Sequence, residues 1–345
     1  MKSTKWMLTG VVCGMVLLAG CARQNSARIS STVEEIQTIE MMPSDAAGEE
    51  AVLVEKEKTE EGTFSEEELV LIETEEILSI ENLSEAVDDQ GNPIPQYEGY
   101  ELVWHDEFSE PELDKSIWSM VFALRGANNH ELQSYELSEE NVYIEDGKLM
   151  LRAIENISET GGKSYTSGKV TTQDKMDMMY GKIVVCGKVP AGKGLWPAIW
   201  MLPTDEALYG HWPTCGEIDI MEILGDDVTT TYSTIHYGAP HLQQQGAYKL
   251  ENGSFADEFH EFSVEWEPDE MRFYVDDELN YTAHDWFCSF NGIDKLDFPA
   301  PFDQTFYLQL NLAVGGDWPG HPDETTDFTN AVFEVDYVRV YQKTE

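Results

Sequence analysis

The segment at residues 215–225, CGEIDIMEILG, constrains the fold of this chain more than any other stretch. It crowds three carboxylates, Glu217, Asp219 and Glu222, among isoleucines, a methionine and a leucine. Like charges a few ångströms apart repel each other, and burial adds to the penalty, so such a cluster ordinarily lies in a solvated loop. The apolar neighbours argue against a loop. A β-strand resolves the conflict, because its side chains alternate between two faces, one dry and one wet.

Simple alternation does not suffice for this strand. It places Glu217 and Asp219 on one face, but it would send Met221 to that face and bury Glu222 in the core. A β-bulge at Ile220 and Met221 would use one extra residue and return Glu222 to the acidic face. We therefore predict a bulged strand that lines an open cleft.

Three carboxyl groups on one face suit the hydrolysis of a glycosidic bond. Cleavage with retention of configuration needs a carboxylate nucleophile and a carboxylic acid about 5 to 5.5 Å apart. A third carboxyl group, on Asp219, would share a proton with Glu217 and help to keep Glu222 protonated. The residues alone leave three alternatives open: a metal site, a non-catalytic sugar-binding module and a solvated acidic strand face.

The first 21 residues predict an export signal. Lys2 and Lys5 precede an apolar run that is too short for a comfortable membrane span. The run ends in LLAGC, which resembles the lipobox of bacterial lipoproteins and implies a lipid on Cys21. This predicts a cell-surface lipoprotein of a bacterium whose only contact with the membrane is the lipid anchor. An ordinary signal or membrane anchor that ends in cysteine is the alternative.

Residues 22–97 read as an acidic, disordered tether. They hold twenty acidic residues against four basic ones, and too little apolar surface to offset the entropy of ordering. The whole chain has 66 acidic and 21 basic residues, so it should repel nucleic acid and sulfated polysaccharides. Cys186, Cys215 and Cys288 show no metal-ligand spacing, and we expect them to be small buried residues.

Residues 98–345 predict a single all-β domain. Short β-rich runs recur between turn residues, and long helical periodicities are missing from this part of the sequence. The run VEWEPDEMRFYVDDE predicts a hairpin with Pro268 and Asp269 at its turn. About 250 residues is a size that sandwiches and barrels often reach.

The ordered motifs of this region identify a family. WHDEFSEPELDKSIW, NNHELQSY, YTSGKVTT, GKGLWPAIWMLP, GHWPTCGEIDIMEILG, IHYG, FHEFSVEW, LNLAVGGDWPG and VDYVRVYQ resemble glycoside hydrolase family 16, and within it the laminarinase-like bacterial endo-β-1,3-glucanases. The resemblance implies a β-jelly-roll sandwich, concanavalin A-like, with a concave substrate groove. It also implies retaining, endo-acting cleavage of β-1,3-glucan by a monomer, without a catalytic cofactor. Mixed-linkage β-1,3-1,4-glucan, β-galactan and a non-catalytic β-glucan-binding protein are the alternatives.

Residue roles follow from the same resemblance. It implies that Glu217 is the nucleophile, Asp219 the assisting carboxylate and Glu222 the acid/base, and the inserted Met221 favours β-1,3-glucan. His236 is expected to form a hydrogen bond near Glu222. The implied substrate-binding residues, which would hold a neutral β-glucan, are Trp196, Trp200, Trp212, His236 and Asn129.

A structural Ca²⁺ is also implied by the family. Its expected ligands are the carboxylate of Asp336 and the backbone carbonyls of Glu107 and Gly147, a mixed oxygen set that calcium prefers. The alternative for Asp336 is an ordinary surface acid.

Overall fold

The computed structural model describes residues 86–88, 90–289, 296 and 298–344. The expected signal with Cys21, and the expected tether up to residue 85, lie outside the described residues. None of the residues that the structure describes forms a helix with the length and apolar character of a membrane span. All named secondary-structure elements in these ranges are β-strands, which confirms the all-β prediction.

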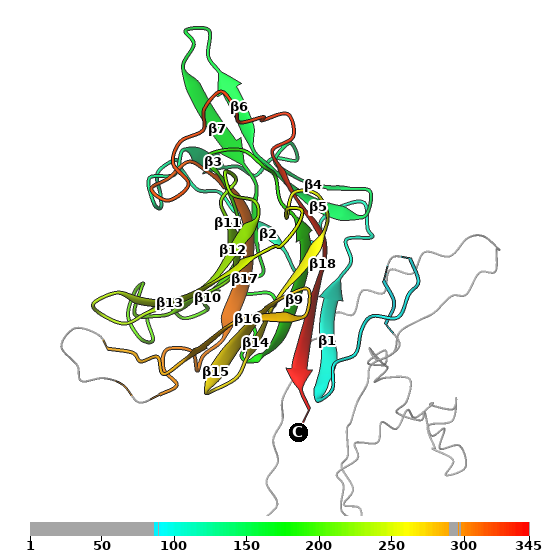
Figure 1. Ribbon diagram of the computed structural model, residues 1–345, viewed down its shortest axis with the longest axis vertical. Coiled ribbons are helices and arrows are strands. Elements are labelled where there is room, and N and C mark those ends of the chain that lie inside the picture. The colour runs from blue at the N-terminus through cyan, green and yellow to red at the C-terminus, as the bar shows by residue number, and fades with distance from the viewer. Residues whose placement is uncertain (1–85, 89, 290–295, 297, 345) are drawn as a thin grey trace, which may run out of the picture. The chain divides into compact units, whose positions relative to one another are not determined.

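Two large sheets face each other (Figure 1). The seven-stranded sheet runs in the spatial order β13 (Leu242–Lys249), β12 (Thr230–Tyr237), β11 (Glu217–Ile223), β10 (Leu195–Pro203), β17 (Phe306–Val314), β8 (Lys169–Thr171) and β2 (Ser119–Met120). The other sheet runs β16 (Glu278–His284), β15 (Glu270–Val275), β14 (His260–Trp266), β9 (Gly181–Lys188), β18 (Val332–Lys343), β5 (Lys148–Arg152) and β4 (Val142–Glu145), and β1 (Tyr100–Asp106) pairs with β18. All of these pairings are antiparallel, as expected for a jelly-roll sandwich.

A third, small sheet stands apart from the two layers. It consists of β3 (Gln133–Tyr135), β7 (Lys163–Ser167) and β6 (Ile154–Ile157), and β3 pairs with β7 in parallel. The β6–β7 hairpin projects from the top of the molecule in Figure 1.

The core lies between the two large sheets and is built by alternation along the strands. In β15, Met271, Phe273 and Val275 are fully buried, while the residues between them face outward. The β14–β15 hairpin places Trp266 opposite Met271, and Pro268 lies within its turn. The hairpin predicted from the sequence is therefore confirmed.

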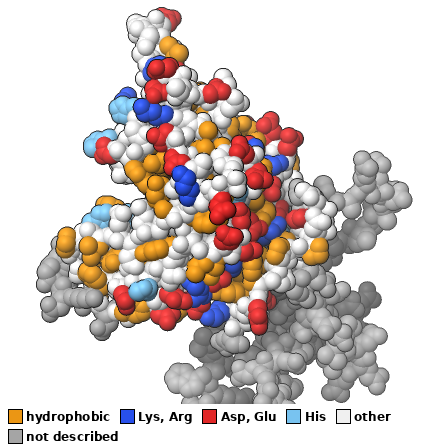
Figure 2. All heavy atoms as spheres, in the orientation of Figure 1, with side chains coloured by type: hydrophobic (Ala, Val, Ile, Leu, Met, Phe, Trp, Pro, Cys, Tyr) orange, Lys and Arg blue, Asp and Glu red, His pale blue; other side chains and the backbone are white. Residues whose placement is uncertain are grey.

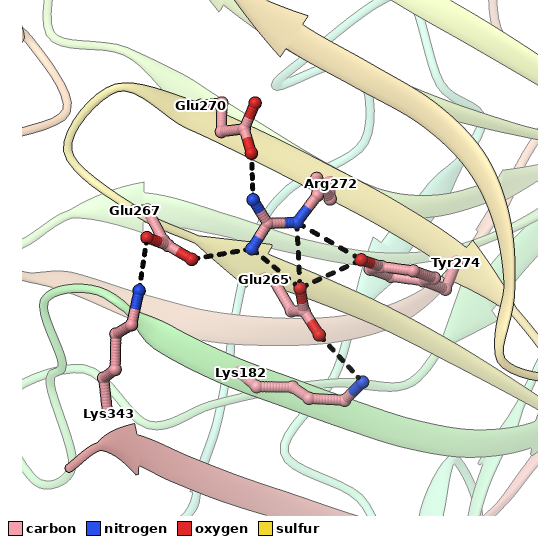
Figure 3. A network of polar contacts seen from close by, with 7 residues as sticks. All are labelled: Lys182, Glu265, Glu267, Glu270, Arg272, Tyr274 and Lys343. Carbon is pink, nitrogen blue, oxygen red and sulfur yellow. Dashed lines mark hydrogen bonds and ion pairs between the residues drawn. The ribbon is translucent and has the colours of Figure 1, made fainter. Parts of the chain in front are cut away.

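Polar side chains on the outer face of the eight-stranded sheet form a network across β9, β14, β15 and β18 (Figure 3). Arg272 lies at its centre and contacts three carboxylates, those of Glu265, Glu267 and Glu270. The network extends to Lys182 at one end and to Lys343 at the other. Because the members come from four strands, their attraction favours one register of this half of the sheet.

Residues 86–88 and 90–97, the described end of the expected tether, pack on this same outer face. Val184 points away from the main core, because it alternates with Ile183 and Val185, which are core residues. Ile94 is 2% exposed and packs with Val184 and Tyr341 in a second, smaller cluster. The Tyr341 hydroxyl also donates to the Pro95 carbonyl at 2.9 Å. This stretch is therefore part of the folded unit.

An ion pair that is buried from solvent joins the end of β1 to β18. The Arg339 guanidinium donates to both carboxylate oxygens of Glu107, at 2.9 and 2.8 Å, and both side chains are buried. Such a bidentate pair holds its partners in one geometry. Loss of Arg339 would leave His105 as the remaining side-chain partner of the buried Glu107 carboxylate among the described residues, which is far more unfavourable than loss of both members of the ion pair.

We therefore predict that Arg339→Met lowers the free energy of unfolding by about 3 to 5 kcal/mol. Urea denaturation at pH 7 would measure it. Lys115→Met is the matched control, because Lys115 and Glu112 form an ion pair in which both side chains are exposed, and its removal should change stability by less than about 1 kcal/mol. Equal, small effects for the two variants would contradict the prediction.

Candidate active site

Strand β11 carries the predicted bulge. Its register against β12 shifts between Asp219 and Glu222, and its register against β10 skips Ile220. Ile220 and Met221 are both buried in the core, as are the isoleucines on either side of the motif. The extra residue therefore lets β11 present an apolar inner face while its three carboxylates share the opposite face, as the sequence predicted.

The three carboxylates are largely removed from water. Asp219 is 3% and Glu222 is 8% exposed, and Glu217 is partly buried. The indole N–H of Trp196 donates to Glu222 Oε1 at 3.1 Å. Asp219 Oδ2 lies 3.3 Å from His236 Nε2 but has no hydrogen-bond partner among the described residues.

Burial dominates the electrostatics of this cluster. It raises the pKa of Glu217 to about 8 and the pKa of Asp219 to about 7, and repulsion by Asp219 adds to the effect on Glu217. Burial, followed by repulsion from Asp219 and Glu217, holds the pKa of Glu222 well above its ordinary value. The hydrogen bond from Trp196 opposes that shift. At neutral pH the three groups therefore share protons rather than carry three charges.

The three predicted groove tryptophans occupy different positions. Trp196 and Trp200 are half-buried on β10, and the Trp200 indole donates to Asn311 Oδ1 of β17 at 2.6 Å. Trp212 is 50% exposed and lies against the ring of His241, with 5.0 Å between the ring centroids. All three keep accessible ring surface, so none of them is a fully buried core residue.

His236 lies beside Asp219. The prediction that it forms a hydrogen bond near Glu222 is therefore wrong. The register of β12 explains the difference, because His236 pairs with Glu217, whereas Tyr232 pairs with Glu222. The other ring nitrogen of His236, Nδ1, is 2.8 Å from Nε2 of His241. Burial lowers the pKa of His236, although Glu217 opposes the shift.

Asn129 lies in a loop next to the end of β17. Its backbone is in the left-handed region, with φ of 45°, and its carbonyl accepts a hydrogen bond from the Asp317 N–H at 3.0 Å. Trp318, which follows Asp317 in the chain, packs edge-on against Trp196 and also contacts Tyr232. Asn129 thus lies beside the loop that carries Trp318, which in turn contacts Trp196.

Two groove residues were missed by the sequence analysis. Trp318 contributes a 39% exposed aromatic ring, and its position between Asp317 and Pro319 in a glycine-rich turn was the available signal. Lys169 is buried on β8, with its ammonium 4.3 Å from the centre of the Trp200 ring. Burial lowers the pKa of Lys169 to about 8. No sequence pattern pointed to Lys169, because a single lysine in a strand creates no periodicity.

The predicted calcium ligands converge along β18. The register of β18 against β9 shifts between Val335 and Tyr337, which places Asp336 at a bulge. On the other side of β18, β5 pairs with β18 as far as Val335, and the pairing of β1 with β18 starts at Val338. Gly147 directly precedes β5 and Glu107 directly follows β1, so both approach β18 near Asp336. One carboxylate and two carbonyls form an all-oxygen donor set that fits calcium.

The space-filling view shows a hollow on one side of the molecule (Figure 2). Figure 2 shows the outline of the molecule hollowed between the β6–β7 side and the β12–β13 side, with histidine and hydrophobic side chains along the hollow. The seven-stranded sheet, which carries the carboxylates and tryptophans, lies on this side of the molecule (Figure 1).

Comparisons with known proteins agree with this arrangement. The family model for glycosyl hydrolases family 16 matches residues 129–330. "Glucan endo-1,3-beta-glucosidase A1" from Niallia circulans is 39% identical over 274 residues, 73% of this chain, but the match spans only 39% of that relative. "Beta-glucanase" from Rhodothermus marinus is 38% identical over 74% of this chain and 89% of its own length.

A solved structure is similar over the same region. The catalytic domain of an endo-1,3-β-glucanase (laminarinase) from Thermotoga petrophila has a TM-score of 0.61 and 38% identity, and the match covers 72% of this chain and all of that domain. The family model covers more than half of this chain, and the Rhodothermus marinus relative, at 38% identity, matches over 89% of its own length. The chain belongs to glycosyl hydrolases family 16.

Proposed function

We propose that this protein is a retaining endo-β-1,3-glucanase that cleaves laminarin-type glucan by double displacement. The observation that carries the proposal is the bulged strand β11, which puts Glu217, Asp219 and Glu222 on one face above a groove lined with tryptophans. The names of the relatives reported above support the choice of a β-1,3-glucan. A neutral polymer also suits a chain with 66 acidic and 21 basic residues.

In this mechanism the two glutamates have different protonation states. Glu222 is the proton donor to the leaving oxygen, because burial and its acidic neighbours favour its neutral form. Glu217 attacks the anomeric carbon and forms a glycosyl ester. Glu222, now a carboxylate, then removes a proton from the water that hydrolyses this ester, and the β configuration returns.

Asp219 has a distinct task, which is to take the proton that Glu217 cannot hold while it attacks. Both pKa values lie near neutrality, at about 8 for Glu217 and about 7 for Asp219, so a proton moves between them with little penalty. The negative charge that remains on the pair favours the protonated form of Glu222. Trp196 holds the Glu222 carboxyl group in place through its indole N–H.

The groove residues would orient the sugar chain. The C–H faces of glucose rings pack against aromatic planes, and Trp200 on β10 and Trp212 and Trp318 in turns offer such surfaces. Asn129 would supply a polar contact near Trp318. The sequence pattern LLAGC further supports a lipid anchor on Cys21, and with it a place on the outer surface of a bacterial cell.

We predict that Glu217→Gln and Glu222→Gln each lower kcat roughly a thousandfold or more on laminarin, because both carboxyl groups act in the transition state. Release of reducing ends would measure turnover, and a melting curve would show that both variants remain folded. Laminarin, lichenan, agarose and carrageenan should be compared side by side. Retention of near-normal activity in either variant would refute the assignment of roles.

The same assay separates the alternatives. Faster hydrolysis of lichenan or agarose than of laminarin would indicate a mixed-linkage glucanase or a galactanase of the same family. Binding of laminarin by the wild-type protein, with no release of reducing ends, would indicate a β-glucan-binding protein instead.

We expect Asp219→Asn to move the whole pH profile of kcat/KM to lower pH, by about one unit. The negative charge of Asp219 raises the pKa of Glu222 and of Glu217, so its removal lowers both. Glu222 would lose its proton at lower pH, and the alkaline limb would shift accordingly. Asp285→Asn, which alters an exposed acid beside His284, is the control and should leave both limbs in place. An alkaline limb that moves upward would contradict the proposed coupling.

We also propose that Asp336, with the carbonyls of Glu107 and Gly147, holds a structural Ca²⁺. A ligand that binds only the native state stabilises it, so EDTA should lower the Tm of the wild-type protein by several degrees. Asp336→Asn should have the low Tm in calcium and show little further response to EDTA. Differential scanning fluorimetry would measure both. A wild-type Tm that does not respond to the chelator would remove calcium from this account.

A further inference from the structure

Asp219 presents a buried oxygen atom without a hydrogen-bond partner. Oδ2 of this 3% exposed side chain has no such partner among the described residues, although His236 Nε2 lies only 3.3 Å away. A buried polar atom in this state is unfavourable unless something else satisfies it. The oxygen and the ring nitrogen both border the same position, so a cation placed between them could contact both.

The other side of the His236 ring is fixed by His241. His236 Nδ1 and His241 Nε2 are 2.8 Å apart, and the two rings are stacked with 5.0 Å between their centroids. In the tautomer that donates the Nδ1 proton to His241, the lone pair of His236 Nε2 faces the carboxylates. A hydrogen bond of this kind on the outer nitrogen is the usual way in which proteins orient a metal-binding histidine.

The distance between two of the three ligand atoms agrees with tetrahedral coordination. Zinc bonds to nitrogen and oxygen of about 2.0 to 2.1 Å, at a tetrahedral angle, place two ligand atoms about 3.3 Å apart. The observed separation of Asp219 Oδ2 and His236 Nε2 is 3.3 Å. Glu217 supplies a third ligand atom, and the three ligand atoms lie within 4.8 Å of one another. Movement of the Glu217 carboxylate toward the same position would complete three corners of a tetrahedron.

We propose that Glu217, Asp219 and His236 form a binding site for Zn²⁺ in the groove, with a fourth position left for water. The imidazole ligand favours zinc over calcium, which prefers oxygen ligands alone. The excess of acidic residues over the whole chain would attract divalent cations toward the groove. This site is separate from the calcium site near Asp336, which lies on the other large sheet.

Bound zinc inhibits the enzyme, and this consequence alone rests on the proposed function. The ion occupies the carboxylate of Glu217, so that oxygen can no longer attack the anomeric carbon. Binding involves no change of oxidation state. The carboxyl protons shared within the cluster leave to solvent as the metal takes their place. Removal of the metal by a chelator restores activity, because no covalent bond of the protein has changed.

The test uses the full chain, treated with EDTA, transferred to metal-free buffer and then saturated with Ca²⁺ to fill oxygen-only sites. Isothermal titration with ZnCl₂ should show one site per chain. His236→Gln should weaken binding more than about tenfold, and His241→Gln about tenfold, since His241 acts through His236. His284→Gln is the matched control, because His284 also lies beside a carboxylate, that of Asp285, but at the exposed end of β16. It should leave affinity unchanged.

Co²⁺ gives a readout that does not depend on activity. In the wild-type protein it should produce the intense visible absorption of tetrahedral Co²⁺, and His236→Gln should remove that band. Glu222→Gln should bind zinc with near wild-type affinity while it lacks hydrolytic activity, so failure of the proposed function and failure of the metal site are distinguishable. Equal zinc affinity in wild-type and His236→Gln protein, or a weak octahedral spectrum, would overturn the proposal. Zinc bound at this site without inhibition of laminarin hydrolysis would overturn its inhibitory part.

Discussion

The bulge in β11 is the constraint on which the active face depends. A strand in a sandwich must give one complete face to the core, and β11 does so with isoleucines and Met221, all buried. With strict alternation, both Glu222 and Met221 would lie on the wrong side of the sheet. The same local irregularity therefore satisfies the packing of the core and brings together carboxyl groups that alternation alone would separate.

The shared face creates an electrostatic problem that its neighbours only partly relieve. Trp196 stabilises charge on Glu222, and His236 lies close to Asp219, but burial outweighs both and favours protonated carboxyl groups. The free energy of folding thus contains an unfavourable term for each proton that leaves the cluster. Buried charges of this kind are common where a protein keeps groups ready for reaction rather than for stability.

The sequence was informative wherever residue type and spacing determine structure, and silent where distant segments meet. The all-β class, the hairpin around Pro268 and the bulge at Met221 follow from period and turn chemistry, which are local. The neighbour of His236 depends on the pairing register of β12 with β11, and the sequence analysis placed it wrongly. The contacts of Trp318 and Lys169 with groove residues arise from loops and strands far apart in the chain, so no local pattern announces them.

The packing of Ile94 has a consequence for how the molecule meets its surroundings. The chain enters the folded unit on the outer face of the eight-stranded sheet, where Ile94 packs with Tyr341, whereas the carboxylates lie on the other sheet (Figure 1). The described start of the folded unit and the three carboxylates thus lie on opposite sides of one body. Under the proposed function, a polymer bound along the carboxylate face would therefore not contact Ile94 or the residues that pack around it.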